Sequence, residues 1–131
     1  MDIEQAFSSF AVSNLDRAEE FYRQTLGLDV KEETQMGLLT LNLPEGLKVT
    51  VYPKQNHVPA AFTVLNFVVK DIDTAVGYLT KQGVKFEIYE GFEQDEKGIA
   101  RSRESSAGPS IAWFKDSEGN IMSVLEDSPQ K

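Results

Sequence analysis

The stretch FAVSNLDRA at residues 10–18 is matched by FVVKDIDTA at residues 67–75. Each copy begins with apolar residues, continues through a short polar step and ends in a segment with helical periodicity. Asn14 and Asp71 occupy the same place in the two copies. Both are good N-caps, because a short side-chain oxygen accepts hydrogen bonds from the free N–H groups of a first helical turn. The repeat therefore predicts two modules that each begin with a strand and a helix.

Each predicted helix carries an apolar stripe at helical spacing and ends at a glycine. The stripes are Leu15, Ala18, Tyr22 and Leu26 in the first helix, and Ile72, Ala75, Val76 and Leu79 in the second. The terminating glycines are Gly27 and Gly83. These patterns favour helices that cover a sheet with one face.

After each helix, the pattern changes to short strand-like runs. The runs are residues 28–31, 38–43 and 47–52 in the first module, and residues 84–89, 110–115 and 121–125 in the second. Two tandem βαβββ modules predict an α+β fold, in which a curved mixed sheet surrounds a cleft. We expect a single domain over residues 1–131, with modules at about 1–54 and 61–131. Residues 92–109 form a long charged loop, a kind of segment that is often functional or mobile.

The composition excludes several classes of function. Thirteen basic and 21 acidic residues give a net charge of −8, which opposes binding to nucleic acid or anionic membranes. The chain has no cysteine, so disulfides, thiolate nucleophiles and cysteine-ligated metals are excluded. His57 is the one histidine, which excludes a site with two imidazoles from one chain. The polar N-terminus and the lack of a long apolar run predict a cytoplasmic protein.

Two segments make the chain similar to a known family. They are NLDRA at residues 14–18, followed by FY at 21–22 and LGL at 26–28, and AWFKDSEGNI at residues 112–121. This pattern resembles the glyoxalase/bleomycin-resistance/dioxygenase superfamily, also called the vicinal oxygen chelate fold. The second segment looks like that family's F-x-D-P-D-G-N hairpin, with Ser117 in place of proline and Glu118 in place of aspartate. The resemblance covers nearly the whole chain.

The resemblance implies a divalent metal held by four residues, two from each module. The corresponding positions in this chain are Phe7, Thr50, Val64 and Ser123. Phe7 and Val64 have no donor atom, and neutral hydroxyls bind metals weakly without carboxylate or imidazole partners. We therefore expect no metal and no other cofactor.

Strand alternation divides the predicted sheet residues between two faces. Phe10, Val12, Phe67 and Val69 are expected to pack under the helices. The opposite face is predicted to line the cleft and to bind a ligand with an apolar, partly aromatic surface. Its residues are Phe7, Ser9, Thr50, Tyr52, Val64, Asn66, Ile111, Trp113 and Ser123. Packing in a core or a dimer interface is the alternative for Trp113, the only tryptophan.

Three further features have both a functional and a structural interpretation. Arg101, Ser102 and Arg103 would suit an anionic ligand group, but neighbouring acids also balance their charge. Glu90, Glu93, Asp95 and Glu96 would suit a cation, but a charged loop is usually solvated. His57 is expected at the surface, because no motif supports its pairing with Ser123. No catalytic residue is predicted.

These observations favour a metal-free protein that binds a small, partly aromatic molecule. An enzyme of the same superfamily, a lyase, isomerase or dioxygenase, is the first alternative, although its metal ligands are missing. A dimeric interaction or regulatory module is the second alternative, because open sheet edges invite pairing. Homodimerisation is expected in each case.

Overall fold

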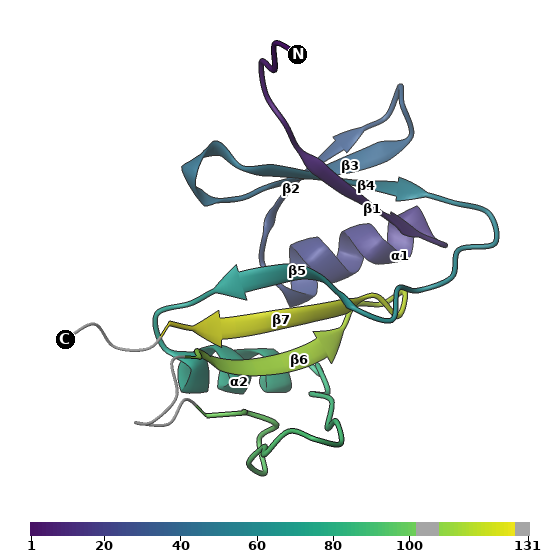
Figure 1. The fold of residues 1–131 in the computed structure, drawn as a ribbon. Coiled ribbons are helices and arrows are strands. Elements are labelled where there is room, and N and C mark those ends of the chain that lie inside the picture. Colours follow the sequence, from purple (N-terminus) through teal and green to yellow (C-terminus); the bar gives the residue numbers. More distant parts are fainter. Residues whose placement is uncertain (102–107, 128–131) are drawn as a thin grey trace. The chain divides into compact units, whose positions relative to one another are not determined.

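The computed structural model describes residues 1–101 and 108–127. The chain divides into two compact units, Met1–Pro59 and Ala60–Lys131. Each unit has its own β-sheet and its own helix (Figure 1). The predicted α+β class is therefore confirmed. Within the described residues, no helix combines the length and the apolar character that a membrane span requires.

The first unit has the predicted βαβββ order. Its elements are β1 (Ser8–Val12), α1 (Leu15–Glu20), η1 (Phe21–Thr25), β2 (Asp29–Glu33), β3 (Leu38–Asn42), η2 (Pro44–Gly46) and β4 (Lys48–Pro53). The sheet order is β1-β4-β3-β2, with β1 parallel to β4 and the other neighbours antiparallel. The first strand of the unit, β1, therefore lies beside the last one, β4.

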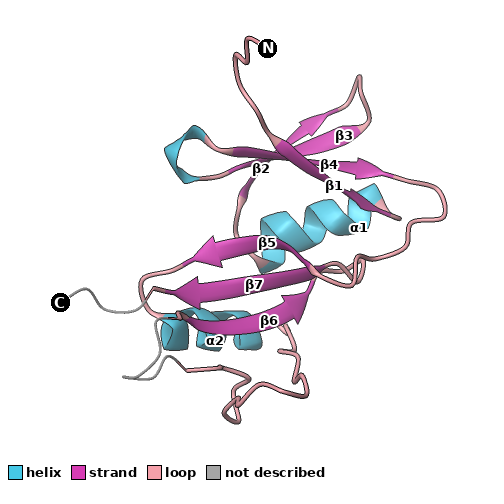
Figure 2. Cartoon of the chain, viewed as in Figure 1, coloured by secondary structure: helices cyan, strands magenta, loops and turns pink. Residues whose placement is uncertain are grey.

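The second unit repeats this topology with one strand fewer. Its elements are β5 (Thr63–Val68), α2 (Ile72–Lys81), β6 (Ser110–Lys115) and β7 (Ile121–Glu126). The sheet order is β5-β7-β6, again with a parallel pair of first and last strands (Figure 2).

The predicted strand at residues 84–89 is wrong. The backbone of this segment pairs with β6 through a bridge between Phe86 and Phe114 and through a hydrogen bond from the Glu87 N–H to the Trp113 carbonyl, at 2.8 Å. The Gln94 side chain takes the hydrogen bonds that a ladder would use next. Its Oε1 accepts from the Tyr89 N–H at 2.8 Å, and its Nε2 donates to the Glu87 carbonyl at 2.9 Å.

Both predicted N-caps are confirmed. Asn14 Oδ1 accepts from the Arg17 N–H at 2.9 Å, and Asp71 Oδ1 accepts from the Thr74 N–H at 3.1 Å. Gly27 and Gly83 lie beyond the helical segments with φ of 71° and 97°, as expected at helix ends. The first helix differs in one respect, because α1 ends at Glu20 and continues as the π-helical turn η1.

Each helix packs on one face of its own sheet. In the first unit, Phe10, Val12 and Tyr22 are buried there, with the Phe10 and Tyr22 ring centroids 5.9 Å apart. In the second unit, the predicted Phe67 and Val69 are half-buried. The buried apolar residues of this second unit are Ile72, Val76, Leu79, Val84, Ile99, Ala112, Phe114, Met122 and Val124. Burial of a large apolar side chain stabilises a fold by about 1.5–3 kcal/mol, so these layers hold each sheet against its helix.

Candidate functional site

The face of the second sheet opposite α2 carries a polar and aromatic row. Asn66 on β5 pairs with Ser123 on β7, and Ser123 pairs with Trp113 on β6. Residues paired across neighbouring strands project to the same face. The structure thus brings together three of the predicted site residues.

An apolar row lies beside this polar row on the same face. Val68 pairs with Leu125, and Leu125 pairs with the predicted Ile111. The Val68 side chain is 67% exposed, while those of Leu125 and Ile111 are half-buried. The open face therefore offers an apolar strip next to polar groups, a combination typical of small-molecule sites.

Ser123 and Asn66 are joined directly. The Ser123 hydroxyl donates to Asn66 Oδ1 at 2.5 Å, and Ser123 is fully buried while Asn66 is exposed. The buried serine therefore fixes the orientation of an exposed amide, whose Nδ2 group is turned away from the serine. The hydroxyl has a single proton, so it does not also donate to a histidine base. The alternative of a nucleophilic Ser123 paired with His57 gains no support.

Trp113 is the centre of an aromatic cluster. Its ring lies 5.6 Å from that of Tyr89 and 4.9 Å from that of Phe92, measured between centroids. Tyr89 and Phe92 were not predicted as site residues. The signal in the sequence was the pair of aromatic residues at positions 89 and 92 within an otherwise polar stretch. Trp113 therefore packs against two aromatic side chains, as the structural alternative predicted, but it is only half-buried.

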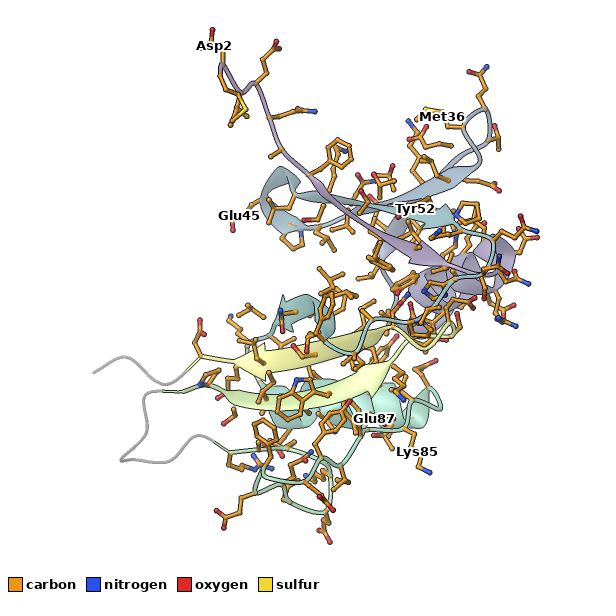
Figure 3. The ribbon with its side chains drawn as sticks, turned by 45° about the vertical axis from the view of Figure 1, so that its right-hand side comes forward. Asp2, Met36, Glu45, Tyr52, Lys85 and Glu87 are labelled. Carbon is orange, nitrogen blue, oxygen red and sulfur yellow. The ribbon has the colours of Figure 1, made fainter. Side chains whose placement is uncertain are left out.

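The Tyr89 hydroxyl is buried, and within the described residues it has no hydrogen-bond partner. Burial, followed by the negative charge of Glu87, raises the pKa of this phenol above its ordinary value. Glu87 lies on the segment that follows α2 (Figure 3). Tyr89 therefore stays neutral over the physiological pH range and contributes an aromatic wall beside Trp113.

Four further predicted residues lie in the first unit, whereas Val64 lies on β5 of the second unit. Ser9 pairs with Thr50 and Ala11 pairs with Tyr52, which places Ser9, Thr50 and Tyr52 on one face of that sheet. Tyr52 on β4 is 39% exposed (Figure 3), and Phe7, immediately before β1, is 61% exposed. The binding role of these residues stays a prediction.

The four positions implied as metal ligands do not fit a metal. Phe7 and Val64 have no donor atom, and the Ser123 hydroxyl is bonded to Asn66. Val64 also lies at a register shift, because Thr63 pairs with Ile121 and Leu65 with Met122, so β5 has one residue more than β7 here.

Among the described residues, the acidic groups that gather closely enough to hold an ion are Asp16, Glu19 and Glu32. Their carboxylate oxygens lie within 4.8 Å of one another, and Glu19 also accepts a hydrogen bond from Arg23 at 2.7 Å. The predicted alternative of a cation site formed by residues 90–96 is not realised in this part of the chain. Asp95 binds Arg101 instead, at 2.8 Å.

Arg101 is held by acidic neighbours. Asp73 on α2 accepts hydrogen bonds from Arg101 at 2.7 and 2.8 Å, and Lys97 donates to the same carboxylate at 3.1 Å. Hydrogen bonds from Arg101 and then Lys97 hold the pKa of Asp73 well below its ordinary value. The structural interpretation of Arg101 is thus confirmed, with Asp73 as a partner that was not predicted. Ser102 and Arg103 lie outside the described residues.

His57 lies in the connector at the end of the first unit and is half-buried. It stands between Asn56, which has a positive φ of 62°, and Val58, which is 82% exposed. The expectation that His57 is a surface residue is thus met in part, because its side chain is half-buried.

Comparison with known proteins finds a family model that matches most of the sequence and several solved structures with a similar fold. The model of the Glyoxalase/Bleomycin resistance protein/Dioxygenase superfamily matches residues 5–124. A glyoxalase family protein from Bacillus anthracis is 20% identical with a TM-score of 0.70, over 98% of this chain and 99% of that one. A superfamily member from Sphaerobacter thermophilus DSM 20745 is 24% identical with a TM-score of 0.69, over 95% and 98%.

A third similar structure is TnmS3, an antibiotic binding protein from Streptomyces sp. CB03234. It is 19% identical with a TM-score of 0.71, over 98% of this chain and 99% of that one. No curated protein matches the sequence significantly. At these identities, the structures establish a shared fold, while the family model covers most of the sequence. This chain belongs to the Glyoxalase/Bleomycin resistance protein/Dioxygenase superfamily.

Proposed function

We propose that the protein binds a small, partly aromatic molecule on the open face around Trp113, without a metal ion. The observation that carries this proposal is the row formed by Trp113, Ser123 and Asn66. Trp113 offers an indole surface for stacking, and the Asn66 amide offers a donor whose orientation is fixed by Ser123. An apolar surface with few oriented polar groups gives both affinity and orientation.

The similarity to TnmS3 supports this class of ligand. That protein is described as antibiotic-binding, and its fold is shared over almost the full length of both chains. We propose by analogy that the ligand here is an organic molecule with an aromatic part. The residues of the first unit that face away from α1, Phe7, Ser9, Thr50 and Tyr52, are proposed as further ligand contacts.

The proposal of a metal-free site rests on donor chemistry. Carboxylates and imidazoles are the groups that hold divalent metals in proteins, whereas the four positions in question are Phe7, Thr50, Val64 and Ser123. At these four positions, the side chains do not suit a lyase or dioxygenase mechanism that depends on a metal Lewis acid. A binding role is therefore favoured over an enzymatic one.

We also propose that residues 1–131 act as one domain within a cytoplasmic homodimer. Within the described residues of its sheet, β5 is an edge strand, and edge strands are common sites of pairing with another chain. Analytical ultracentrifugation tests this point, since a monomer at micromolar concentration contradicts it.

Titration with a planar aromatic probe tests the binding function. Proflavine, a three-ring cation, suits a chain with a net charge of −8. We expect saturable quenching of the single tryptophan, since Trp113 is the residue on which the probe stacks. Substitution Trp113→Leu should weaken binding at least about tenfold in calorimetry, which is the loss expected from one strong aromatic contact.

The matched control for Trp113→Leu is Tyr78→Leu. Tyr78 lies on α2, is 46% exposed and belongs to the same unit. Equal loss in the two variants contradicts the proposed face. Elemental analysis of protein purified without chelators or nickel resin tests the absence of a metal. A metal near one per chain contradicts the metal-free proposal and favours the enzyme alternative.

A further inference from the structure

The segment that carries Phe92 is closed at its base by Gln94. Its Nε2 group donates to the Glu87 carbonyl at 2.9 Å and to the Gly98 carbonyl at 2.8 Å, while its Oε1 accepts from the Tyr89 N–H at 2.8 Å. A second anchor lies further along, where Arg101 binds Asp73. The base of the segment is thus fixed to the rest of the second unit.

The tip of the segment, residues 90–93, presents Phe92 to Trp113. Gly91 has φ of 89°, a conformation that favours glycine, and Phe92 follows it directly. The Phe92 side chain is 56% exposed although its ring lies 4.9 Å from the Trp113 ring. Because more than half of the phenylalanine is already in water, moving it from Trp113 removes little more than this one aromatic contact.

A ligand ring does not fit between these two side chains as they stand. Two layers of stacked atoms need about 7 Å between the outer rings, since non-bonded carbons approach to about 3.5 Å. The centroids of Phe92 and Trp113 are only 4.9 Å apart. A ligand that stacks on this side of the indole must therefore replace the phenyl ring.

We propose that Phe92 is a built-in competitor whose ring, tilted by 56° to the indole, fills the space beside Trp113 that a ligand ring needs. This inference rests on the proposed function, because it concerns the same face. The tip at residues 90–93 then works as a gate that opens above the base clamped by Gln94. Binding requires the open state, so the apparent affinity equals the intrinsic affinity multiplied by the open fraction.

The gate selects for ligand size. Displacement of Phe92 costs every ligand the same, whereas the gain from stacking rises with the aromatic area that covers the indole. A single ring replaces one phenyl contact with a similar one and gains little. A fused, planar ring system covers more of the Trp113 indole and keeps a net gain. The ligand class that the geometry favours is therefore the fused-ring aromatic compound.

Charge adds a second preference. Phe92 stands between Gly91 and Glu93, with Glu90 one residue further, and the whole chain has a net charge of −8. These acids at the tip attract cations through the Coulomb interaction, most strongly at low salt. Two cationic probes of different size, proflavine with three fused rings and benzamidine with one, are the appropriate pair for a test.

The test compares wild-type protein with Phe92→Ala by isothermal titration calorimetry. If the phenyl ring competes for Trp113, its removal should tighten both probes by the same factor, about two- to tenfold, which corresponds to the strength of one aromatic pair. The control is Phe62→Ala, which truncates another exposed phenylalanine of the same unit, 68% exposed, and should leave both affinities unchanged. Circular dichroism verifies that each variant is folded.

The possible outcomes separate the gate from the function. Equal tightening of both probes in Phe92→Ala supports the gate. Weaker or unchanged binding in this variant, with binding by the wild-type protein, makes Phe92 a wall or a bystander and overturns the gate while the proposed function stands. Tightening that differs strongly between the probes also overturns it, because a gate affects all ligands equally. If neither protein binds either probe, the proposed function and the gate both fail.

Discussion

Arg101 donates hydrogen bonds from both of its terminal guanidinium nitrogens to the carboxylate oxygens of Asp73, at 2.7 and 2.8 Å. This two-point contact joins the end of the segment after α2 to the first turn of that helix. A planar guanidinium and a carboxylate match in geometry, so this pair fixes the relative orientation of the two side chains in addition to their charge attraction. The Arg101–Asp73 contact thus positions the end of the segment whose Tyr89 and Phe92 rings contact Trp113.

The Asp73 contact predicts a defined pH dependence of stability. The pKa of Asp73 is lowered in the folded state by hydrogen bonds from Arg101 and Lys97. A lowered folded pKa means that the stabilisation is present above the unfolded pKa, about 3.9, and is lost as the pH falls below it. Wild-type protein should thus unfold at a higher temperature than Asp73→Asn between pH 5 and pH 8, and the difference should shrink below about pH 4.

Thermal unfolding at several pH values measures this difference. Asp127→Asn, at an exposed aspartate after β7, is the control and should follow the wild-type curve. High salt should also reduce the Asp73 effect, because exposed charges are screened. A difference that is constant down to pH 2 would show that the carboxylate charge is not the cause.

The two N-caps should contribute equally to stability. Asn14 and Asp71 each accept one hydrogen bond from a first-turn N–H group, at 2.9 and 3.1 Å. Asn14→Ala and Asp71→Ala should each lower the free energy of unfolding by about 1 kcal/mol in urea denaturation. Asn14→Asp and Asp71→Asn keep the acceptor oxygen and should retain most of the stability, so equal losses in both kinds of variant would contradict a capping role.

Substitution of Asp116, in the hairpin between β6 and β7, should lower stability more than substitution of either N-cap. Its Oδ1 accepts from the N–H groups of Glu118 and Asn120, both at 2.8 Å, and the residue is 6% exposed. Asp116→Ala leaves two N–H groups without this acceptor and should lower the free energy of unfolding by about 2–4 kcal/mol. Asp116→Asn keeps an acceptor and should cost about 1 kcal/mol. Urea denaturation distinguishes these values.

The Ser123–Asn66 pair makes a prediction about binding. Asn66→Ala removes the oriented amide and should weaken proflavine binding about tenfold, the size expected for one hydrogen bond. Ser123→Ala leaves the amide present but free to rotate and should weaken binding about threefold. Calorimetry on both variants, with urea denaturation as a measure of fold integrity, tests this order. A larger loss in Ser123→Ala than in Asn66→Ala would contradict the positioning role of the serine.

The sequence predicted the elements whose signals are local. The caps at Asn14 and Asp71 lie next to the apolar stripes that they introduce, and both helices begin where expected. The strands at residues 38–43, 47–52, 110–115 and 121–125 agree with the structure to within one residue at either end. Alternation also placed Asn66, Trp113 and Ser123 on one face, because the strand pairing is regular at these three residues.

The sequence did not predict the segment after α2, since its structure depends on contacts between distant residues. The Gln94 side chain takes the hydrogen bonds of Glu87 and Tyr89, and Ala100 pairs with Ile111 of β6 where a full strand would continue. Likewise, Asp73 and Arg101 form their hydrogen bonds although they are 28 positions apart in the sequence, and no periodic pattern predicts such a pair. Tyr89 and Phe92 were missed for the same reason, because their partner Trp113 lies on β6, far along the chain.

The extra residue of β5 has an evolutionary consequence. The chain carries two versions of one module, and duplicated halves are free to diverge wherever a length change leaves the pairing intact. At Val64, β5 has one residue more than β7, yet the register from Leu65 to Val68 is unbroken. A change of one residue in length at this point would leave the pairing of the rest of the strand intact, so this is a position where evolution can insert or delete a residue without loss of the sheet.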